Sequence, residues 1–119
     1  MFNIEFYVNE KGEVPVCDYL RELKKKVKTD KKSRILYEKI YYYIGILERF
    51  GTRRGEKYTK HIEEDIWELR PIGDRIFFFY WKDNTFVLLH HFQKKTQKTP
   101  KREIEQAKRN RDDFLRSKK

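Results

Sequence analysis

The hydrophobic pattern of the first fifty residues predicts one strand followed by two helices. Apolar and polar side chains alternate over residues 2–8, which is the period of a half-buried strand. Residues 15–26 carry apolar side chains at i, i+3, i+4 and i+7, so we expect a short helix with Pro15 in its first turn. Asp30 is the expected N-cap of a longer helix, which should end at Gly51.

The second half of the chain predicts a meander of three strands and a closing helix. The strands are expected at 66–70, 75–82 and 85–92, with turn sequences between them. The middle strand, RIFFFYW, is apolar on both faces and should lie at the centre of the sheet. The closing helix should open with Thr99 as its N-cap and Pro100 as its first residue.

This order, β-α-α-β-β-β-α, predicts an α+β fold and a single domain over residues 1–119. We expect an antiparallel sheet, with the first strand at its edge or paired within it. The helices are expected to pack on one face of the sheet. The opposite face would then stay partly open and could receive a substrate.

The charge of the chain is high and uneven. Net charge is +10, and residues 94–119 hold 11 basic against 4 acidic side chains. This balance favours an acidic partner, either nucleic acid or an acidic protein, although a solvated basic helix would have the same composition. Cys17 is the single cysteine, which excludes an internal disulfide. No stretch approaches the roughly 20 apolar residues that span a membrane, and the first residues lack the apolar run of a signal peptide, so a cytoplasmic setting is expected.

Basic side chains gather at the ends of the predicted strands. Arg75 opens the central strand, where a guanidinium on a rigid element would suit a phosphate, unless it is only a strand-end arginine with its head in water. Glu68 and Arg70 share one face of a strand, either as a surface ion pair or as a carboxylate that orients the arginine or moves a proton. Lys94 and Lys95 precede a helix N-terminus, whose free N–H groups could help to hold an anion.

The two neighbouring histidines are less informative. His90 and His91 end the last strand, and their side chains should diverge, which is poor geometry for one metal ion. One of them is either an acid, base or base-stacking group, or a structural histidine. The chain also lacks a phosphate-binding loop, a zinc-ligand pattern and a nucleophile elbow. Candidate groups that are nearly all cations suit an anionic transition state, as in phosphoryl transfer without a metal.

Several strings resemble a known family. IWELR, DRIFFFYW and LLHHFQKKTQKTPKREIEQAKRNRDDF, with VPVCDYL near the start, are similar to the phage-derived, HigB-like branch of the RelE/ParE toxin superfamily. The resemblance covers nearly the whole chain. It implies a fold like that of small microbial ribonucleases and a type II toxin that works as an mRNA interferase with no metal or other cofactor. In such enzymes the 2′-hydroxyl attacks the adjacent phosphate, commonly in the ribosomal A site.

The resemblance also suggests roles for the basic residues. Arg75, with Arg70, would hold the scissile phosphate and stabilise its growing negative charge. Lys94 or Lys95, which match the basic cluster after the last strand, or His90, would protonate the leaving 5′-oxygen.

One carboxylate and several dispersed basic residues are further candidates. Glu68, from the E-L-R element, would orient Arg70 or take the 2′-hydroxyl proton. Lys101, Arg102 and Lys108 are expected either to be solvated or to contact ribosomal RNA. Lys60 and Lys98 are further candidates for RNA binding.

Two other functions stay open on the sequence. A ParE-like toxin would share the fold but inhibit DNA gyrase without cutting RNA, and a non-toxic module would only bind nucleic acid. The resemblance further implies a cognate antitoxin with a helix-turn-helix domain, with messenger RNA and the ribosome as the other partners and no membrane. Any oligomer is expected to form through the antitoxin.

Overall fold

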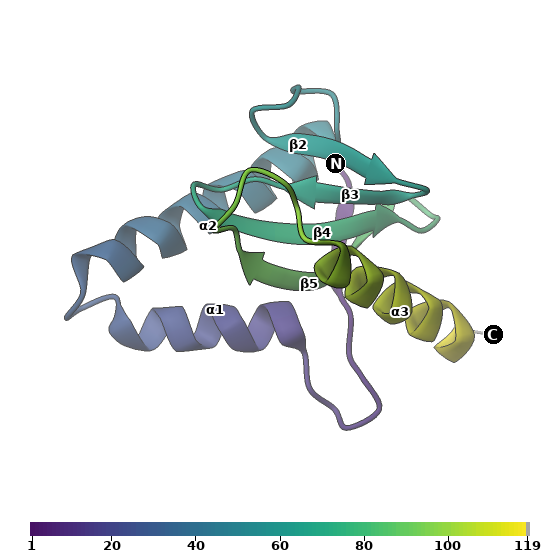
Figure 1. The fold of residues 1–119 in the computed structure, drawn as a ribbon, viewed down its shortest axis with the longest axis horizontal. Helices are drawn as coiled ribbons and strands as arrows, with labels where there is room; N and C mark the ends of the chain where they lie inside the picture. The colour runs from purple at the N-terminus through teal and green to yellow at the C-terminus, as the bar shows by residue number, and fades with distance from the viewer. Residues whose placement is uncertain (119) are drawn as a thin grey trace.

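The computed structural model describes residues 1–118, and three helices and five strands make up that part of the chain (Figure 1). In chain order they are β1 (Asn3–Phe6), α1 (Pro15–Lys26), α2 (Lys31–Phe50), β2 (Thr59–Glu63), β3 (Ile66–Leu69), β4 (Asp74–Tyr80), β5 (Thr85–Gln93) and α3 (Lys101–Ser117). The predicted α+β fold class is therefore confirmed. The observed fold is consistent with the RelE-like architecture that the sequence resembles.

The sheet has the order β1-β5-β4-β3-β2. Strands β3, β4 and β5 form the antiparallel meander that was expected, and β2 extends it by one further antiparallel strand. Strand β1 lies at the other edge, one of the two positions expected for it, but it runs parallel to β5, with Asn3 opposite Thr85. The expectation of a wholly antiparallel sheet was therefore wrong for the pairing of β1 with β5. The long connection through α1 and α2 explains it, because a crossover of this length allows parallel pairing.

The sequence pattern did not predict strand β2, so the chain has one strand more than expected. Its sequence, TKHIE, contains a single large apolar residue, Ile62, and most of its side chains are exposed. It is an edge strand, paired only with β3, and its register is broken by a bulge between His61 and Glu63. An edge strand that buries so little produces almost no hydrophobic pattern.

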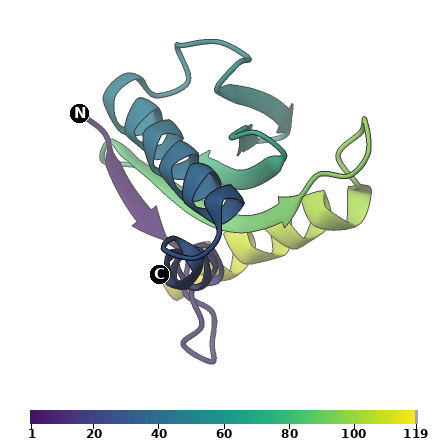
Figure 2. The ribbon, with the colours of Figure 1, turned by 90° about the vertical axis from the view of Figure 1, so that its left-hand side faces the viewer.

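The helices cover both faces of the sheet, so the expectation that they pack on one face was wrong. Apolar residues of α1 and α2, including Leu20, Ile40 and Leu47, pack on the face that carries Ile76 and Phe78. Helix α3 packs on the face that carries Phe77. Figure 2 shows α2 and α3 on either side of the central strands. The cause is visible in RIFFFYW, since a strand that is apolar on both faces needs cover on both.

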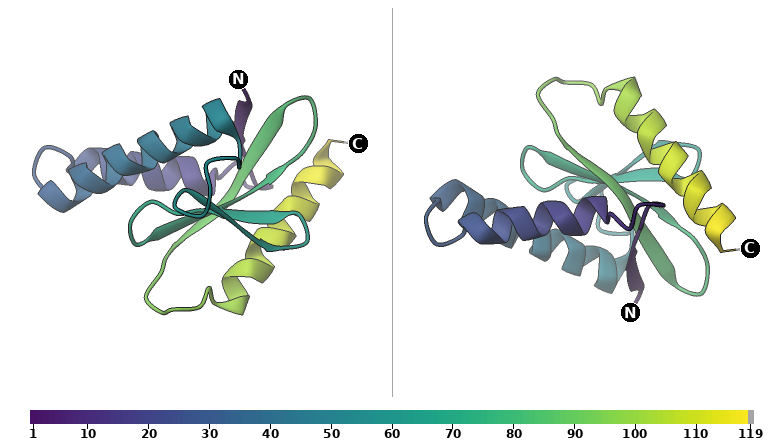
Figure 3. Two further views of the ribbon diagram at one scale, coloured as in Figure 1. Left: turned by 90° about the horizontal axis from the view of Figure 1, so that it is seen from above. Right: turned by 90° about the horizontal axis from the view of Figure 1, so that it is seen from below.

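Helix α3 does not cover the whole of its face. It lies obliquely across the sheet, and the α1–α2 hairpin extends past the sheet on the other side (Figure 3). Ile104, Ala107 and Phe114 anchor α3 over β4 and β5. The end of the sheet where β3 stops and β4 starts is crossed instead by the loop between β5 and α3 (Figure 1).

The helix boundaries test the predicted caps. Asp30 caps α2 through a bond from the Lys32 N–H at 3.2 Å, and Gly51 ends that helix at φ 63°, both as expected. The N-cap of α3 is Pro100, with no side-chain cap, so the assignment of Thr99 as cap was wrong. The Thr99 hydroxyl donates to Glu68 Oε1 at 3.2 Å instead. The Thr99 hydroxyl is thus hydrogen-bonded to a buried carboxylate and does not cap the helix.

Candidate functional site

A basic pocket lies where β3 ends, β4 begins and β5 ends. The strands bring these ends together because Asp74 pairs with Gln93, and the Lys94 N–H donates to the Gly73 carbonyl at 2.7 Å. The pocket has a volume of about 590 Å³ and is open to solvent. We call it the cationic pocket; it is lined by Arg70, Gly73, Arg75, Lys94, Lys95, Thr96 and Gln97.

Glu68 lies behind the cationic pocket and organises it. Its side chain is only 1% exposed. Oε2 lies 3.3 Å from Arg70 Nε and 3.5 Å from Arg75 Nε, while Oε1 accepts the hydroxyl of Thr99. Both carboxylate oxygens are therefore occupied and shielded. A group in this position can orient the two guanidiniums, but it has no path to a proton on a bound ligand.

The two arginines are fixed by further contacts with the backbone. Arg75 Nη1 donates to the carbonyls of Ile72 and Asp74, each at 2.8 Å, and Arg70 Nη1 donates to the Glu56 carbonyl at 2.8 Å. Within residues 1–118, the Nη2 atoms of both arginines make no hydrogen bond. Each guanidinium is therefore held by hydrogen bonds through Nη1 and by ion-pair contact of Nε with Glu68, and within the described residues the buried Nε atoms make no hydrogen bond of their own.

Lys94 is the third cation of the pocket, and the pKa of its ammonium is lowered. Burial lowers the pKa of its ammonium; Glu68 opposes this shift, and the positive charges of Arg75, Arg70 and Lys60 reinforce it. Lys60 belongs to the same surroundings because it lies opposite Glu68 in the pairing of β2 with β3. An ammonium with a lowered pKa releases its proton more readily than an ordinary lysine.

The charges of this region do not balance. Arg70, Arg75 and Lys94 surround one carboxylate, Glu68. Asp74 adjoins Arg75 in sequence, but its carboxylate accepts the hydroxyl of Tyr19 from α1, and burial raises its pKa. In the part of the chain that the structure describes, Lys60, Lys94 and Lys95 form no ion pair. The pocket therefore carries excess positive charge on a rigid strand framework.

The histidines lie away from the cationic pocket. His90 faces α3, where its Nε2 lies 2.7 Å from Glu103 Oε1. His91 faces α1 and stacks on Tyr19 with ring centroids 3.7 Å apart. Burial lowers the pKa of His91 to about 4, which keeps it neutral. The predicted divergence of the pair is confirmed, and neither ring lines the pocket.

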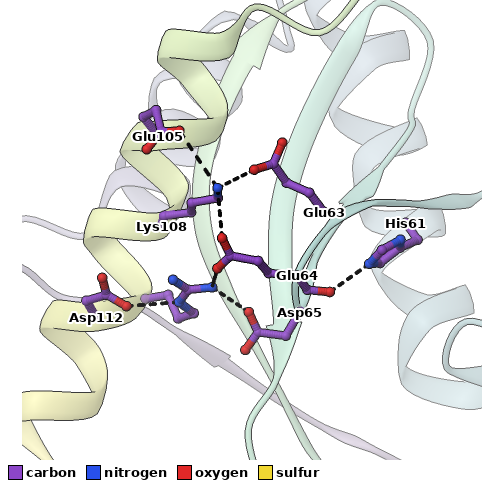
Figure 4. Close-up of polar contacts among 8 residues, drawn as sticks. His61, Glu63, Glu64, Asp65, Glu105, Lys108 and Asp112 are labelled. Carbon is purple, nitrogen blue, oxygen red and sulfur yellow. Dashed lines mark hydrogen bonds and ion pairs between the residues drawn. The ribbon is translucent and has the colours of Figure 1, made fainter.

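The outer basic residues fall into two groups. Lys60, Lys98, Lys101 and Arg102 are exposed around the pocket and the start of α3. Among these four, Arg102 pairs with one carboxylate, that of Glu103, at 3.4 Å. Lys108 is different, because its ammonium pairs with three carboxylates, those of Glu63, Glu64 and Glu105 (Figure 4).

Lys108 is part of an ion-pair network that fastens α3 to the β2–β3 turn. Arg111, one turn further along α3, contacts Glu64 at 3.0 Å, Asp65 at 2.5 Å and Asp112 at 3.0 Å. We call Lys108, Arg111 and these carboxylates the α3 latch. Its carboxylates raise the pKa of Lys108 above the ordinary lysine value. The charge of Lys108 is therefore already matched within the protein.

Sequence reasoning found the cations of the pocket but missed two of its supports. Thr99 was expected to cap a helix, and its bond to Glu68 joins residues 31 positions apart. Ile72 was only part of a turn signal, yet its carbonyl fixes Arg75. Neither contact has a local signal, because each depends on how the β5–α3 loop and the β3–β4 turn come together in the fold.

The fold and the pocket define a small α+β protein with a rigid, cationic pocket at one end of its sheet. Comparison with family models agrees with this class. Residues 18–112 match the model described as Phage derived protein Gp49-like (DUF891), and the chain belongs to that family. This is a type II toxin family related to RelE- and HigB-type toxins. No protein with a curated description matched the chain.

Within residues 1–118, no helix has the length and apolar content needed to cross a membrane. The same residues contain no group of three or more His, Cys, Asp or Glu side chains placed to hold a metal ion.

Proposed function

We propose that this chain is an mRNA interferase, the toxin of a type II toxin–antitoxin pair. The observation that carries the proposal is the cationic pocket, in which Arg70, Arg75 and Lys94 share the single carboxylate of Glu68. A bound phosphodiester would supply the missing negative charge. The charge that grows on its oxygens during cleavage would be stabilised further, as in other sites built from fixed donors.

The arginines bind and orient the phosphate in this proposal. Arg75 and Arg70 each have Nη2 free, while Glu68 and backbone carbonyls hold the rest of each guanidinium. The donors are thus in place before the substrate arrives, so little reorganisation is needed at the transition state.

Lys94 is the proposed general acid. The 2′-oxygen attacks phosphorus, and the bond to the 5′-oxygen breaks as Lys94 gives that oxygen a proton; the 2′-hydroxyl proton passes to water at the mouth of the pocket. The lowered pKa of Lys94 favours this transfer. Lys95 is exposed at the rim and contributes charge.

Glu68 is a positioning residue in this scheme. Its two oxygens are committed to Arg70, Arg75 and Thr99, and its side chain is almost fully buried. Of the two roles that the sequence left open for Glu68, the geometry favours orientation of the arginines over abstraction of the 2′-hydroxyl proton.

The proposed partners follow from the charge and the family. Lys60, Lys98, Lys101 and Arg102 would meet the RNA backbone on either side of the pocket, in the ribosomal A site. Toxins of this family imply an antitoxin partner. We propose that this antitoxin carries a helix-turn-helix domain and neutralises the cationic surface.

The experiment is expression of the chain without an antitoxin, followed by mapping of messenger RNA ends. We expect growth arrest and cuts within codons. Lys94→Met should lower cleavage by about 10²–10⁴-fold, the usual contribution of a general acid. Lys82→Met, which removes the same charge from the turn at the opposite end of β4, should cleave normally. If growth stopped while RNA stayed intact and gyrase supercoiling was inhibited, the chain would be a ParE-like toxin instead. If growth were normal, the chain would be a module that only binds nucleic acid.

A further inference from the structure

An apolar hollow adjoins the cationic pocket. It has a volume of about 390 Å³ and lies between the start of α2, the β3–β4 turn and the end of β5. Its apolar surface comes from Ile35, Leu36 and Ile72. Gly73, Lys94 and Lys95 line both this hollow and the cationic pocket, so the two sites share a wall.

Ile72 has an unusual backbone and an unusual exposure. Its φ is 50°, in the left-handed region, where a β-branched residue is strained. The side chain is nevertheless directed outward, and the residue is 55% exposed. Gly73, which could adopt a positive φ at no steric cost, does not. Neither packing nor turn chemistry explains an isoleucine here, whereas strained residues of this kind cluster at ligand-binding sites.

The groups of the cationic pocket hold this strained turn in place. Arg75 Nη1 donates to the Ile72 carbonyl at 2.8 Å. The Lys94 N–H donates to the Gly73 carbonyl at 2.7 Å, and the Asp74 N–H closes the turn on the Pro71 carbonyl at 2.9 Å. The position of Ile72 is therefore fixed relative to the site where a phosphate would bind.

We propose that the apolar hollow is a nucleobase subsite and that Ile72 is a wedge beside the scissile phosphate. The inference rests on the proposed function. A nucleotide carries its phosphate and its base on opposite sides of the sugar, which matches a cationic pocket and an apolar hollow that share one wall. The base would lie against Ile72 and Ile35, while Lys94 and Lys95 face the phosphate.

A wedge at this position would favour the attack of the 2′-oxygen on the phosphate. In stacked, helical RNA the 2′-oxygen is not in line with the bond to the 5′-oxygen, so stacking opposes cleavage. Apolar side chains, isoleucine among them, can enter between neighbouring bases and unstack them. Ile72 is thus a positioning residue: it separates the two bases that flank the phosphate and turns the 2′-oxygen toward the line of attack.

The test uses a short RNA with a 2′-deoxy residue at the cleavage position and 2-aminopurine beside it. The emission of 2-aminopurine rises when the base unstacks. We expect emission to rise when the full-length wild-type chain binds. Ile72→Asn, which suits a positive φ, should still bind the RNA but lose this rise, and on the cleavable RNA its kcat should fall about tenfold, within the range of a base-stacking contact.

Two further variants separate the wedge from the fold. Ile72→Leu should keep both the emission rise and kcat, because it restores an apolar side chain. Ile35→Ala changes the hollow without touching the turn and should weaken the emission rise. A thermal midpoint for Ile72→Asn at or above that of the wild type would exclude unfolding as the cause, since the substitution relieves strain.

The outcomes that overturn the inference are distinct from failure of the proposed function. Wild-type emission and kcat in Ile72→Asn would overturn the wedge even if Lys94→Met were inactive. If Ile72→Asn left RNA binding and emission unchanged but weakened binding of an acidic, leucine-containing peptide, the hollow would be a protein-docking surface and the base assignment would be wrong. A chain that cuts no RNA would overturn the proposed function, while the emission of the bound probe would still test the subsite.

Discussion

The cationic pocket and the α3 latch are both clusters of basic side chains on the α3 side of the sheet, yet they are built in opposite ways. In the latch, Lys108 and Arg111 share five carboxylates: Glu63, Glu64, Asp65, Glu105 and Asp112. In the pocket, Arg70 and Arg75 share the carboxylate of Glu68, and within residues 1–118 Lys94 forms no ion pair. The charges of the latch are matched within the protein, whereas the pocket keeps an excess of positive charge.

The comparison shows that net charge alone does not locate a binding surface. The chain carries +10, and much of that excess lies in residues 94–119. Two conspicuous cations of that segment, Lys108 and Arg111, are nevertheless paired, and their pairing holds α3 against the β2–β3 turn (Figure 4). Binding potential depends on which cations lack local carboxylates, and that depends on the tertiary fold.

The largest expected difference between the clusters is in RNA cleavage. Arg75→Ala should lower kcat/KM by about 10²–10³-fold, as loss of a fixed electrostatic donor usually does. Arg111→Ala should cleave within about twofold of the wild type. Both variants are assayed on ribosomes programmed with a defined message, with circular dichroism as the check on folding. Equal losses in the two variants would remove the distinction between pocket and latch.

The next difference is in stability. Glu68→Gln leaves two largely buried guanidiniums without their carboxylate, so the free energy of unfolding should fall by about 3 kcal/mol. Glu64→Gln removes an exposed carboxylate from the latch and should have a much smaller effect, because exposed pairs are screened by water. Urea unfolding at pH 7 measures both. Inorganic phosphate should restore more stability to Glu68→Gln than to the wild type, and its failure to do so would contradict an anion site in the pocket.

A smaller effect is expected in the salt dependence of RNA binding. Each phosphate contact on a single strand contributes about 0.7 to the slope of log K against log salt. Arg75→Gln should reduce the slope by about that amount, while Arg111→Gln should leave it unchanged. Fluorescence titrations of a labelled oligonucleotide at several salt concentrations give the slopes. A reduced slope in Arg111→Gln would show that latch cations also reach RNA.

The smallest effect is a difference in acidity between two lysines. Burial lowers the pKa of Lys94, whereas carboxylates raise the pKa of Lys108. As pH rises, Lys94 should therefore lose its proton below 10.5, the ordinary lysine value, and Lys108 should keep its proton above that value. The side-chain NMR signals of the two lysines follow each charge, with Lys94→Met and Lys108→Met for assignment. Cleavage should decline on the alkaline side together with the Lys94 signal.

The parts of the fold that follow from local pattern were predictable. Local sequence patterns placed seven of the eight strands and helices within a few residues, and the Asp30 and Gly51 helix signals were confirmed. Strand β2 was not predictable because it buries little, and the side of the sheet that α3 covers depends on packing between distant segments.

The candidate site could be predicted in its residue types but not in its arrangement. The sequence singled out Arg70, Arg75 and Lys94 as candidates, and the fold brings them into one pocket. His90 was a further candidate, ranked behind Lys94 and Lys95, and in the structure its side chain contacts Glu103. The burial of Glu68 and its bond to Thr99 decide its role, and both are products of tertiary structure.

The parallel pairing of β1 with β5 affects when this protein can fold during its synthesis. Within the sheet, the first strand of the chain pairs with a strand that begins at Thr85, and α3, which closes the opposite core, comes later still. Contacts so distant in sequence cannot form until residues far along the chain have been made, which slows folding and places closure of the sheet late. In a member of a toxin family built in this way, the pocket can assemble only after the residues up to Gln97 have been synthesised.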